Sequence, residues 1–514
     1  MMPAADRTDA VCARYRDYGP SLRPTRQDAC AAPMNPFPVL PLELDRVPRG
    51  LAMALEQEGV PVCTRGEHPV GRFVLFDGRQ RLSRPPAAWQ VPIDVAPIRR
   101  GCEDDPFDAM LDERSTRCRW EVTGLVLTEQ IAGTDRRQVR RRIVSRLRER
   151  IEQAGGVWMT LAPYPFPYRS SVNFRIDYDR YDAGDFQNTM ATIRDHAGAT
   201  SHYVAGEAYE SAPEALRQFE GLDVGSHGYR HCVGRNESEN YENVKRGIDV
   251  LRHNGLAPSG FSAPGGQYTR TLAAALEQLA VGHSSEIGLA YDDWPFWPNR
   301  SSVLQIPVHP VSLGLFLANV RGAGVRRAVA AQQAVRAAVD YFRQVARAKY
   351  HAGEPVFFYG HLTGRLGHYP QVIRAVFDTA DSFAAVWPTT HTGFAAWWRA
   401  RAKIELRVEG DAEQYTISAK DLPRRWPVAV EYWRGPRVAR LPLTGGTTRF
   451  SPGAVAYENR SFRPTAQPVR VEASHGLRHH MRRLLDRERQ MPDDDTQSHN
   501  WHRWAARTLR WFGG

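Results

Sequence analysis

The feature that most constrains the fold is an alternation of strand-like and helix-like segments over residues 166–400. Apolar runs of strand length are separated by segments in which apolar residues recur three or four positions apart, which is the spacing of one helix face. An alternation of this length predicts a parallel sheet with helices packed on it, most simply a barrel. The functional residues of such barrels gather at the carboxyl ends of the strands. Strands are expected over residues 172–178, 202–205, 223–225, 260–263, 303–308 and 355–359, and helices over 238–254, after Thr269 and over 325–350.

The regions that flank this alternation have a different composition. At about 100–200 residues per domain, a chain of 514 residues is expected to form about three domains. Residues 36–165 have the pattern of a small α/β unit, with a helix expected over 136–154. Residues 401–475 contain short alternating segments separated by Gly, Pro and Asp, which is typical of a small antiparallel β domain. We therefore divide the chain into a disordered leader (1–35), an N-terminal α/β domain (36–165), the barrel (166–400), the β domain (401–475) and a basic amphipathic tail (476–514).

Targeting and cysteine patterns favour a cytoplasmic protein. Residues 1–26 carry scattered charges without the apolar core of a secretory signal, and no apolar run is long enough to predict a membrane helix. The 6 cysteines form no CxxC pair and have no regular spacing, which is typical of free thiols in a reducing compartment.

The basic charge of the chain lies mostly outside the barrel. The formal net charge is +11, and arginines cluster over 136–150 and 478–510. The simplest interpretation is a set of solvated arginine-rich faces, and because no nucleic-acid-binding pattern accompanies them, nucleic acid is not expected as a partner. The tail carries Trp501, Trp504 and Trp511 among basic residues. It can either pack on the protein itself or make a peripheral contact with the inner face of an anionic membrane.

Two aspartates and an arginine alternate along the strand expected over 172–178. Residues two apart on a strand share a face, so Arg175, Asp177 and Asp179 project together while their apolar neighbours face a core. Charges at the carboxyl end of a strand are costly to bury unless they pair or bind a metal. Taken alone, the motif also fits an exposed, charged strand end.

Two histidines follow the strand expected over 223–225. His227 and His231 lie four apart, a spacing that lets two imidazoles reach one ion from a single helical turn. By themselves they are better explained as solvated or core histidines. Together with the aspartate pair one βα step upstream they indicate a metal site. Two histidines and one carboxylate leave coordination positions open, as catalytic metal sites do.

Two further segments follow strands of the same region. GFSAPGGQY, residues 260–268, is a tight turn that can bring backbone N–H groups close to a substrate. His361 directly follows the apolar run VFFYG, so it is expected at the carboxyl end of a strand, where a histidine suits general acid catalysis near neutral pH. His309 also follows a strand and is most simply structural, whereas Glu286 is a further candidate substrate contact.

The order of these motifs resembles that of the polysaccharide deacetylase family, the NodB-homology domain of carbohydrate esterases. The ordered set is Asp-x-Asp, His-x3-His, a Pro-Gly loop, Tyr-Asp-Asp-Trp and a late strand ending in His, and it covers about residues 166–400. The resemblance implies a distorted (β/α) barrel that removes acetyl groups from N-acetylated sugars. The stretch HSSEIGLAYDDWPFWP followed by LQIPVHP resembles in particular the deacetylases linked to bacterial surface-polysaccharide assembly.

The resemblance also implies a role for each motif residue. Asp177 matches the general base and Asp179 the metal carboxylate, although the spacing of DYD leaves the reverse assignment open. His227 and His231 match the metal histidines and His361 the general acid, and the implied cofactor is Zn²⁺ or another divalent transition metal. The residues expected to bind the substrate are Pro264 and Gly265 in the turn, and Asp293, Trp294 and Trp297 in a groove wall whose indole rings would face a sugar.

One position departs from the family pattern. The third motif of the family usually carries an arginine two residues before the proline, where this chain has Ser262. We hypothesise that Arg175, on the same strand face as Asp177, takes over the task of orienting that aspartate.

These residues together predict metal-dependent hydrolysis of an N-acetyl group, with acetate and a free amino sugar as products. The substrate would be an N-acetylated sugar in a surface polysaccharide or in its lipid-linked precursor.

Three alternatives stay open. The first is another C–N hydrolase on the same scaffold, such as an imide or allantoin-type amidohydrolase. The second is a carbohydrate-binding pseudoenzyme, which Ser262 mildly favours, and the third is a membrane-associated assembly factor that acts through its tail.

Overall fold

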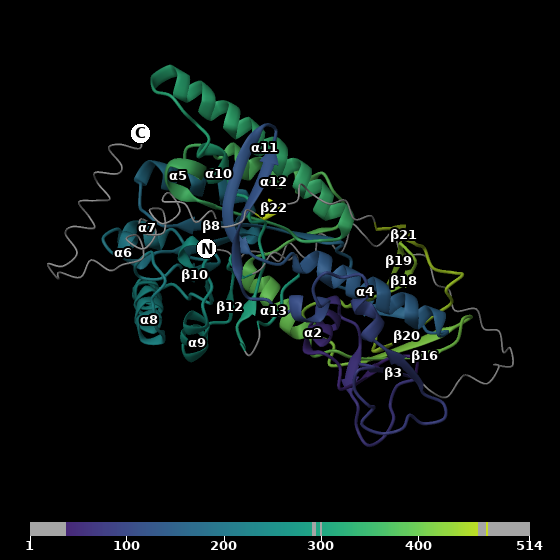
Figure 1. Ribbon diagram of the computed structural model, residues 1–514. Coiled ribbons are helices and arrows are strands. Elements are labelled where there is room, and N and C mark those ends of the chain that lie inside the picture. The colour runs from purple at the N-terminus through teal and green to yellow at the C-terminus, as the bar shows by residue number, and fades with distance from the viewer. Residues whose placement is uncertain (1–37, 290–293, 299–300, 461–468, 471–514) are drawn as a thin grey trace.

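The computed structural model describes residues 38–289, 294–298, 301–460 and 469–470 (Figure 1). Its centre is an eight-stranded parallel sheet in the order β13-β12-β11-β10-β9-β8-β14, with β15 beside β8. The two outer strands approach each other, because the N–H of His309, beyond β13, donates to the carbonyl of Phe357 on β14 (2.8 Å). This is the predicted distorted (β/α) barrel. Its strands are β8 (Ser170–Tyr178), β9 (Thr200–Val204), β10 (Val224–Ser226), β11 (Gly260–Phe261), β12 (His283–Ser284), β13 (Leu304–Gln305), β14 (Val356–His361) and β15 (Val386–Pro388).

Helices cover the outside of this sheet (Figure 1). Helix α8 illustrates why they form: the side chain of Asn236 caps it by accepting from the N–H of Glu239 (2.9 Å). Val244, Ile248 and Leu251 form its buried face, as their spacing predicts. The helices of the barrel region are α5 (Ala183–Ile193), α6 (Gly206–Tyr209), α7 (Pro213–Arg217), α8 (Glu237–His253), α9 (Arg270–Gln278), α10 (Leu313–Leu317), α11 (Gly324–Ala352), α12 (Gln371–Asp381) and α13 (His391–Arg401).

A smaller parallel sheet, in the order β2-β1-β3-β4, forms the N-terminal unit. Helix α4 packs on it through Ile143, Leu147 and Ile151, which are 0% exposed, and it matches the helix expected over 136–154. The elements of this unit are β1 (Leu42–Asp45), α2 (Arg49–Glu58), β2 (Val62–Thr64), β3 (Phe73–Phe76), β4 (Val91–Asp94), α3 (Pro106–Ala109) and α4 (Arg136–Gln153).

The arginines of α4 do not form the solvated face that the sequence suggests. Arg140 is 0% exposed, and its Nε donates to Oε1 of Glu58 (2.8 Å). Arg137 and Arg141 both pair with the buried carboxylate of Glu354, just before β14. Buried charges persist when they are paired, so Arg137 and Arg141 tie the N-terminal unit to the barrel, while Arg140 joins α4 to α2.

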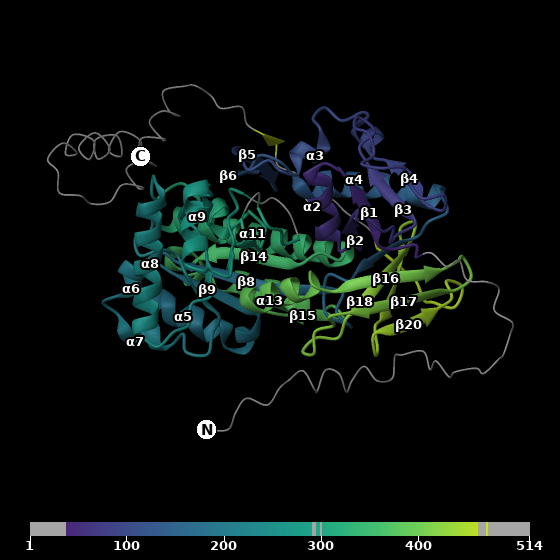
Figure 2. The same cartoon turned by 90° about the horizontal axis from the view of Figure 1, so that it is seen from below.

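Strands from both sides of the barrel region share one antiparallel sheet. β7 (Trp158–Leu161) pairs with β18 in the order β21-β19-β18-β7. Regions 36–165 and 401–475 are therefore continuous in structure, lying beside the barrel in Figure 2, and the five-part division of the chain stays a prediction. The leader, and the tail at 476–514, lie outside the described residues. The remaining strands of this part are β16 (Glu405–Gly410), β17 (Tyr415–Lys420), β18 (Ala429–Arg434), β19 (Arg437–Pro442), β20 (Thr447–Phe450) and β21 (Glu458–Asn459).

A long hairpin, β5 (Ser115–Val122) and β6 (Leu125–Ala132), reaches from the N-terminal unit to the barrel (Figure 1). The N–H of Ala132 donates to the carbonyl of Ile287, beyond β12 (2.9 Å). The side chain of Asn319, beyond α10, donates to the carbonyl of Val126 (3.2 Å). Because Ile287 follows a barrel strand, the hairpin runs along the rim where barrel sites are found.

The sequence predicts no membrane-spanning helix and no disulfide framework, and the structure can be compared with these two predictions only over the described residues. No helix there is both long and apolar enough to cross a lipid bilayer. The cysteines that can be described carry free thiols, as predicted, and they are Cys63, Cys102, Cys118 and Cys232.

Candidate metal centre and catalytic site

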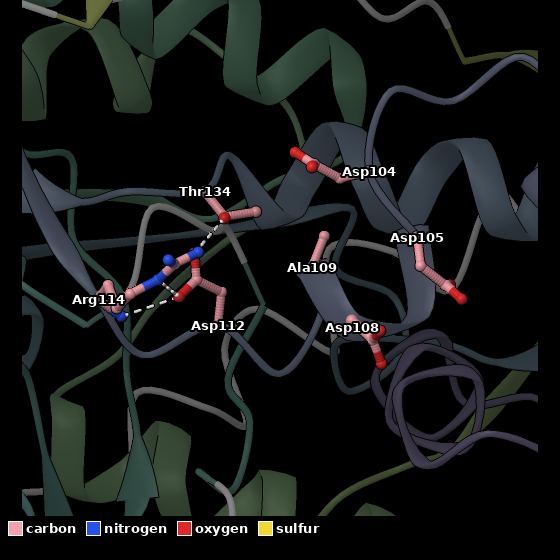
Figure 3. A pocket seen from close by; sticks show the side chains of 7 residues that line it. All are labelled: Asp104, Asp105, Asp108, Ala109, Asp112, Arg114 and Thr134. Atoms are coloured by element: carbon pink, nitrogen blue, oxygen red, sulfur yellow. Dashed lines mark hydrogen bonds and ion pairs between the residues drawn. The ribbon is translucent and has the colours of Figure 1, made fainter. Parts of the chain in front are cut away.

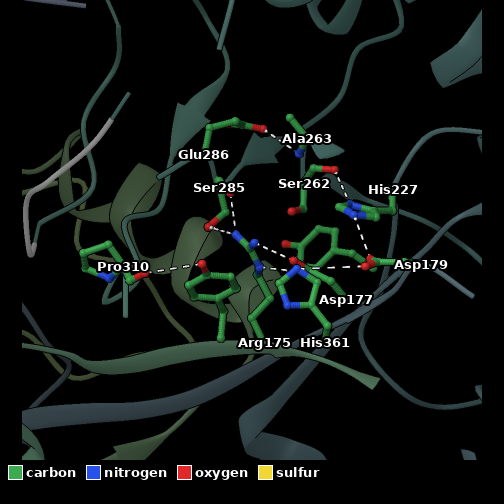
Figure 4. Close-up of polar contacts among 12 residues, drawn as sticks. Arg175, Asp177, Asp179, His227, Ser262, Ala263, Ser285, Glu286, Pro310 and His361 are labelled. Carbon is green, nitrogen blue, oxygen red and sulfur yellow. Dashed lines mark hydrogen bonds and ion pairs between the residues drawn. The ribbon is translucent and has the colours of Figure 1, made fainter. Parts of the chain in front are cut away.

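The carboxyl half of β8 carries a buried ion pair. Arg175 and Asp177 are each 1% exposed. The guanidinium donates to both carboxylate oxygens, from Nε to Oδ1 at 3.0 Å and from Nη2 to Oδ2 at 2.7 Å (Figure 4). Its Nη1 donates to the carbonyl and hydroxyl oxygens of Ser285, and the ring of Tyr359 lies 4.8 Å from its central carbon. Arg175 thus holds the carboxylate of Asp177 in one orientation.

Asp179, His227 and His231 converge beside this pair. Oδ1 of Asp179 lies 3.3 Å from Nε2 of His227 and 3.4 Å from Nε2 of His231. Ligand atoms around a tetrahedral Zn²⁺, each bound at ~2.0–2.1 Å, are themselves about 3.3–3.4 Å apart. Among the described residues, the buried Nε2 of His227 and Oδ1 of Asp179 have no hydrogen bond of acceptable geometry, so a cation between them would satisfy both atoms. The three residues therefore fit a divalent metal ion.

A loop, and not the expected helical turn, carries the two histidines. After β10 the chain turns at Gly228, whose φ of +82° lies in the left-handed region, and the next helix begins only at Glu237. The side chain of Asn243 on α8 holds the loop by accepting from the N–H of Arg230 (2.7 Å) and donating to the carbonyl of Cys232 (2.9 Å). The helical expectation was wrong because a spacing of four residues does not distinguish a helical turn from a glycine turn.

The loop after β11 orients His227. Nδ1 of His227 lies 2.6 Å from the carbonyl oxygen of Ser262. Because a carbonyl can only accept, Nδ1 carries a proton, and Nε2 is the ring nitrogen turned towards Asp179, where it can bind a metal ion. Ser262, the position at which the sequence departs from the family pattern, thus contributes through its backbone.

His361 completes the group. It ends β14 and pairs in register with Asp177 on β8, and its Nε2 lies 4.0 Å from Oδ2 of Asp179. Its side chain is 21% exposed. The sequence-predicted catalytic and metal residues are therefore gathered at the carboxyl ends of β8, β10 and β14.

The charges and burial of the site shift the pKa values of His361 and Asp179, among others. Burial lowers the pKa of His361 to about 4, against the opposing effect of the Asp179 carboxylate. Burial acts to raise the pKa of Asp179, but His361, His227 and His231 outweigh it and hold that pKa well below its ordinary value. At neutral pH Asp179 is therefore ionised, as a metal ligand must be, and His361 is neutral.

Several solved structures are similar to part of this chain. A protein from Mycobacterium smegmatis, described as a polysaccharide deacetylase, is 18% identical with a TM-score of 0.39, over 47% of this chain and 94% of that one. A second from Pseudomonas aeruginosa, also described as a polysaccharide deacetylase, is 17% identical with a TM-score of 0.37, over 45% and 91%. A CE4 family pseudoenzyme from Bacillus anthracis is 11% identical with a TM-score of 0.31, over 45% and 68%.

Two of these structures are described as polysaccharide deacetylases. This is the family whose ordered motifs the sequence resembles. No protein-family model and no curated protein sequence matches the chain. Identities and TM-scores this low do not transfer an activity or a residue's role to this chain.

The turn that the sequence predicts to contact the substrate lies beyond β11. Pro264 and Gly265 belong to the short turn η4 (Pro264–Gly266), in which Gly265 is exposed. Their contact with a substrate stays a prediction, and Asp293 lies outside the described residues.

Trp294 does not line a groove as predicted. Its side chain is buried, and its ring stacks on Trp398 of α13 with centroids 6.0 Å apart. The side chain of Gln57 on α2 donates to its carbonyl (3.3 Å). The groove prediction was wrong for Trp294 because contacts with α2 and α13, both distant in sequence, place it in the core. Trp297 is half-buried and packs against the same core.

Two residues of the site were missed in the sequence. Tyr359 lies two positions before His361, so the period of a strand could have placed it on the same face. Ser285 carries no sequence signal, because its contact with Arg175 depends on β12, which has only 2 residues.

His309, expected to be structural, is buried, and its Nε2 lies 2.9 Å from the hydroxyl of Tyr341.

A separate concave region lies on the N-terminal unit (Figure 3). Asp112 accepts there from Arg114 (2.8 Å) and Thr134 (2.9 Å), and Asp105 accepts from Arg99 (2.6 Å). These contacts give Asp105 and Asp112 structural roles. None of Asp179, His227 and His231 lines the region. Its lining residues are Asp104, Asp105, Asp108, Ala109, Asp112, Arg114 and Thr134.

Proposed function

We propose that the chain is a divergent polysaccharide deacetylase that hydrolyses an N-acetyl group of an N-acetylated sugar and releases acetate in a metal-dependent reaction. The observation that carries this proposal is the convergence of Asp179, His227 and His231 on one point beside the Arg175–Asp177 pair. Three protein ligands leave coordination positions open, as in catalytic metal sites. The proposed substrate is a surface polysaccharide or its lipid-linked precursor.

Asp179, His227 and His231 would hold Zn²⁺ or another divalent transition metal. Two imidazoles and one carboxylate suit these ions better than Mg²⁺ or Ca²⁺, which prefer oxygen ligands. When bound, such an ion polarises the acetyl carbonyl and lowers the pKa of a bound water toward ~7.

Asp177 would act as the general base. The two hydrogen bonds from Arg175 leave its carboxylate one orientation within the buried site. Asp177 removes a proton from the attacking water as the water oxygen bonds to the acetyl carbon. Because the carboxylate cannot rotate, it is already oriented for proton transfer, and this orientation is the contribution expected of Arg175.

His361 would deliver the proton to the leaving nitrogen. With a pKa of about 4, its imidazole is neutral at neutral pH and must accept a proton before it can donate one. We propose that the proton taken from water passes to His361, which lies beside Asp177 in the strand register, and then to the nitrogen as the C–N bond breaks. The water oxygen then ends in acetate, and the proton ends on the amine.

An acetate-release assay tests this function. The full chain is incubated with chitooligosaccharides and other N-acetylated sugars, with and without a zinc chelator. We expect release that the chelator stops and added Zn²⁺ restores, and a His227→Ala protein that lacks both zinc and activity. Acetate release that persists without metal would contradict the metal role, and zinc-loaded protein that releases none would contradict the deacetylase function.

A second candidate function is hydrolysis of another C–N bond, such as that of a cyclic imide or of allantoin. It is favoured by the burial of Trp294, because an aromatic groove was the feature that pointed to a sugar in particular. Adding allantoin and a cyclic imide to the same panel separates the two functions. A carbohydrate-binding pseudoenzyme would instead bind sugar and zinc without forming a product.

The proposed cytoplasmic location rests on sequence patterns alone, and the proposed membrane contact depends on residues 476–514, which lie outside the described residues. Co-sedimentation of the full chain with anionic vesicles, compared with a chain that lacks residues 476–514, tests the membrane contact. Equal binding by both proteins would contradict a contact through the tail.

A further inference from the structure

Glu286 is a buried carboxyl group that the proposed reaction does not use. It follows β12 and is 2% exposed. Its Oε1 accepts from the N–H of Ala263 (3.2 Å) and from the hydroxyl of Ser284, and its own N–H donates to the side chain of Gln305 (3.4 Å). Burying a carboxyl group is costly, so the donors that it meets set its position.

The N–H that Glu286 binds belongs to the peptide group that orients His227. One peptide plane joins Ser262 to Ala263 and contains the carbonyl of the first and the N–H of the second. That carbonyl accepts from Nδ1 of His227 at 2.6 Å, while the N–H donates to Glu286 (Figure 4). The carboxyl group, the peptide and the imidazole therefore form a continuous chain of hydrogen bonds that ends at the metal group.

This series of hydrogen bonds changes the electron density on the imidazole of His227. Hydrogen bonds in series polarise one another, so a carboxylate that draws on the N–H makes the carbonyl of the same peptide a stronger acceptor. A stronger acceptor holds the proton on Nδ1 of His227 and makes Nε2 more electron-rich. Metal-binding histidines commonly donate directly to a carboxylate for the same purpose. Here a peptide group stands between the two.

We propose that Glu286 is a positioning residue of the metal site, acting on His227 through the Ser262–Ala263 peptide. The inference rests on the proposed metal function of Asp179, His227 and His231. It adds a residue that has no hydrogen bond to Asp179, His227 or His231, and it predicts that Glu286 sets metal affinity without touching the ion.

Zinc affinity of purified variants, measured by competition with a chromophoric chelator, tests the proposal. Glu286→Ala removes the acceptor and should weaken zinc binding by about 10–100-fold. Glu286→Gln keeps an oxygen that can accept from Ala263, so its affinity should lie closer to that of the wild type. Ser285→Ala is the matched control, because this neighbouring hydroxyl contacts Arg175 and not the peptide, and its zinc affinity should be unchanged.

A spectroscopic signature separates this role from a loss of folding. In zinc-loaded protein labelled with ¹⁵N-histidine, the Nδ1–H resonance of His227 should move upfield in Glu286→Gln, because the peptide carbonyl becomes a weaker acceptor. An unchanged resonance in Glu286→Gln, or wild-type zinc affinity in a folded Glu286→Ala protein, would overturn the inference. A wild-type protein that binds no zinc would instead contradict the proposed function.

Discussion

At the residue scale, the site depends on how a buried arginine is used. Each of the three guanidinium nitrogens of Arg175 has a protein partner, and its planar group matches the carboxylate of Asp177. Such an arrangement needs the geometry of arginine as well as its charge. The pair stays buried because neither member is left without its counter-ion.

Replacing Arg175 should therefore impair catalysis more than metal binding. In Arg175→Ala the carboxylate of Asp177 loses its fixed orientation, and we expect kcat/KM to fall by about 10²–10⁴-fold, the range of general base catalysis. Zinc content should persist, because Asp179 and the two histidines are untouched. Arg175→Lys keeps the charge but not the two-point contact and should recover only part of the loss. Near wild-type turnover in Arg175→Ala would remove Arg175 from the mechanism.

The buried Glu286 predicts a pH dependence of stability. Burial raises its pKa to about 7, above the value of 4.5 expected when unfolded. A raised folded-state pKa contributes stability that is complete below about pH 4.5 and is lost as the pH rises through about 7. In metal-free wild-type protein, the ionisation of Glu286 should lower the free energy of unfolding by about 2–3 kcal/mol between about pH 5 and 8. Glu286→Gln should lack this part of the decrease. Denaturant titrations at both pH values measure this, and identical declines in the two proteins would refute it.

The sequence predicted residues whose chemistry and spacing stand out along the chain. Asp179, His227 and His231 were grouped correctly because each follows a barrel strand, and such strand ends meet. Ser285 could not be predicted, because a serine carries no pattern. Trp294 was misplaced because an apolar ring suits a sugar groove and a protein core equally well.

At the scale of elements, a single turn sets where the histidines lie. Gly228 has a φ of +82°, and a Cβ there would lie 2.8 Å from Nδ2 of Asn243 and 2.9 Å from the carbonyl oxygen of Arg230. Those atoms belong to the contacts that hold the loop between His227 and His231. The strand periods and the apolar face of α8 were predictable from sequence, whereas this turn was not.

Gly228→Ala should therefore weaken both the fold and the metal site. We expect a loss of about 1–3 kcal/mol in the free energy of unfolding and a clear loss of zinc affinity, because the loop must shift. Gly255→Ala is the matched control, since its φ is +80° but nothing lies within 4 Å of an added Cβ. It should lose stability and keep zinc affinity. Wild-type zinc affinity in Gly228→Ala would contradict the proposed role of the turn.

At the scale of the whole molecule, the barrel shares its core with the regions on either side. β7 pairs with β18, and one cluster of buried residues runs from Val39 to Phe450. The sequence predicted the class of each region from its local pattern. It could not predict the pairing of Trp158 with Trp433, because contacts between segments so far apart leave no local signal.

A chain that ends at residue 400 should not fold independently. It would lose β18 and expose the edge of β7, together with apolar residues of the shared core. We expect aggregation on expression, whereas the full chain should unfold in one cooperative transition by calorimetry. A truncated protein that is monomeric and binds zinc with wild-type affinity would mean that the barrel folds without the region 401–475.

The proposed function requires that Asp179, His227 and His231 bind one divalent transition metal. Crystals of the full chain grown with one equivalent of Zn²⁺ test it through anomalous diffraction measured on both sides of the zinc absorption edge. We predict one strong peak at about 2.0–2.2 Å from Nε2 of both histidines and from a carboxylate oxygen of Asp179. The absence of a peak there, or a peak bound by other residues, would contradict the account.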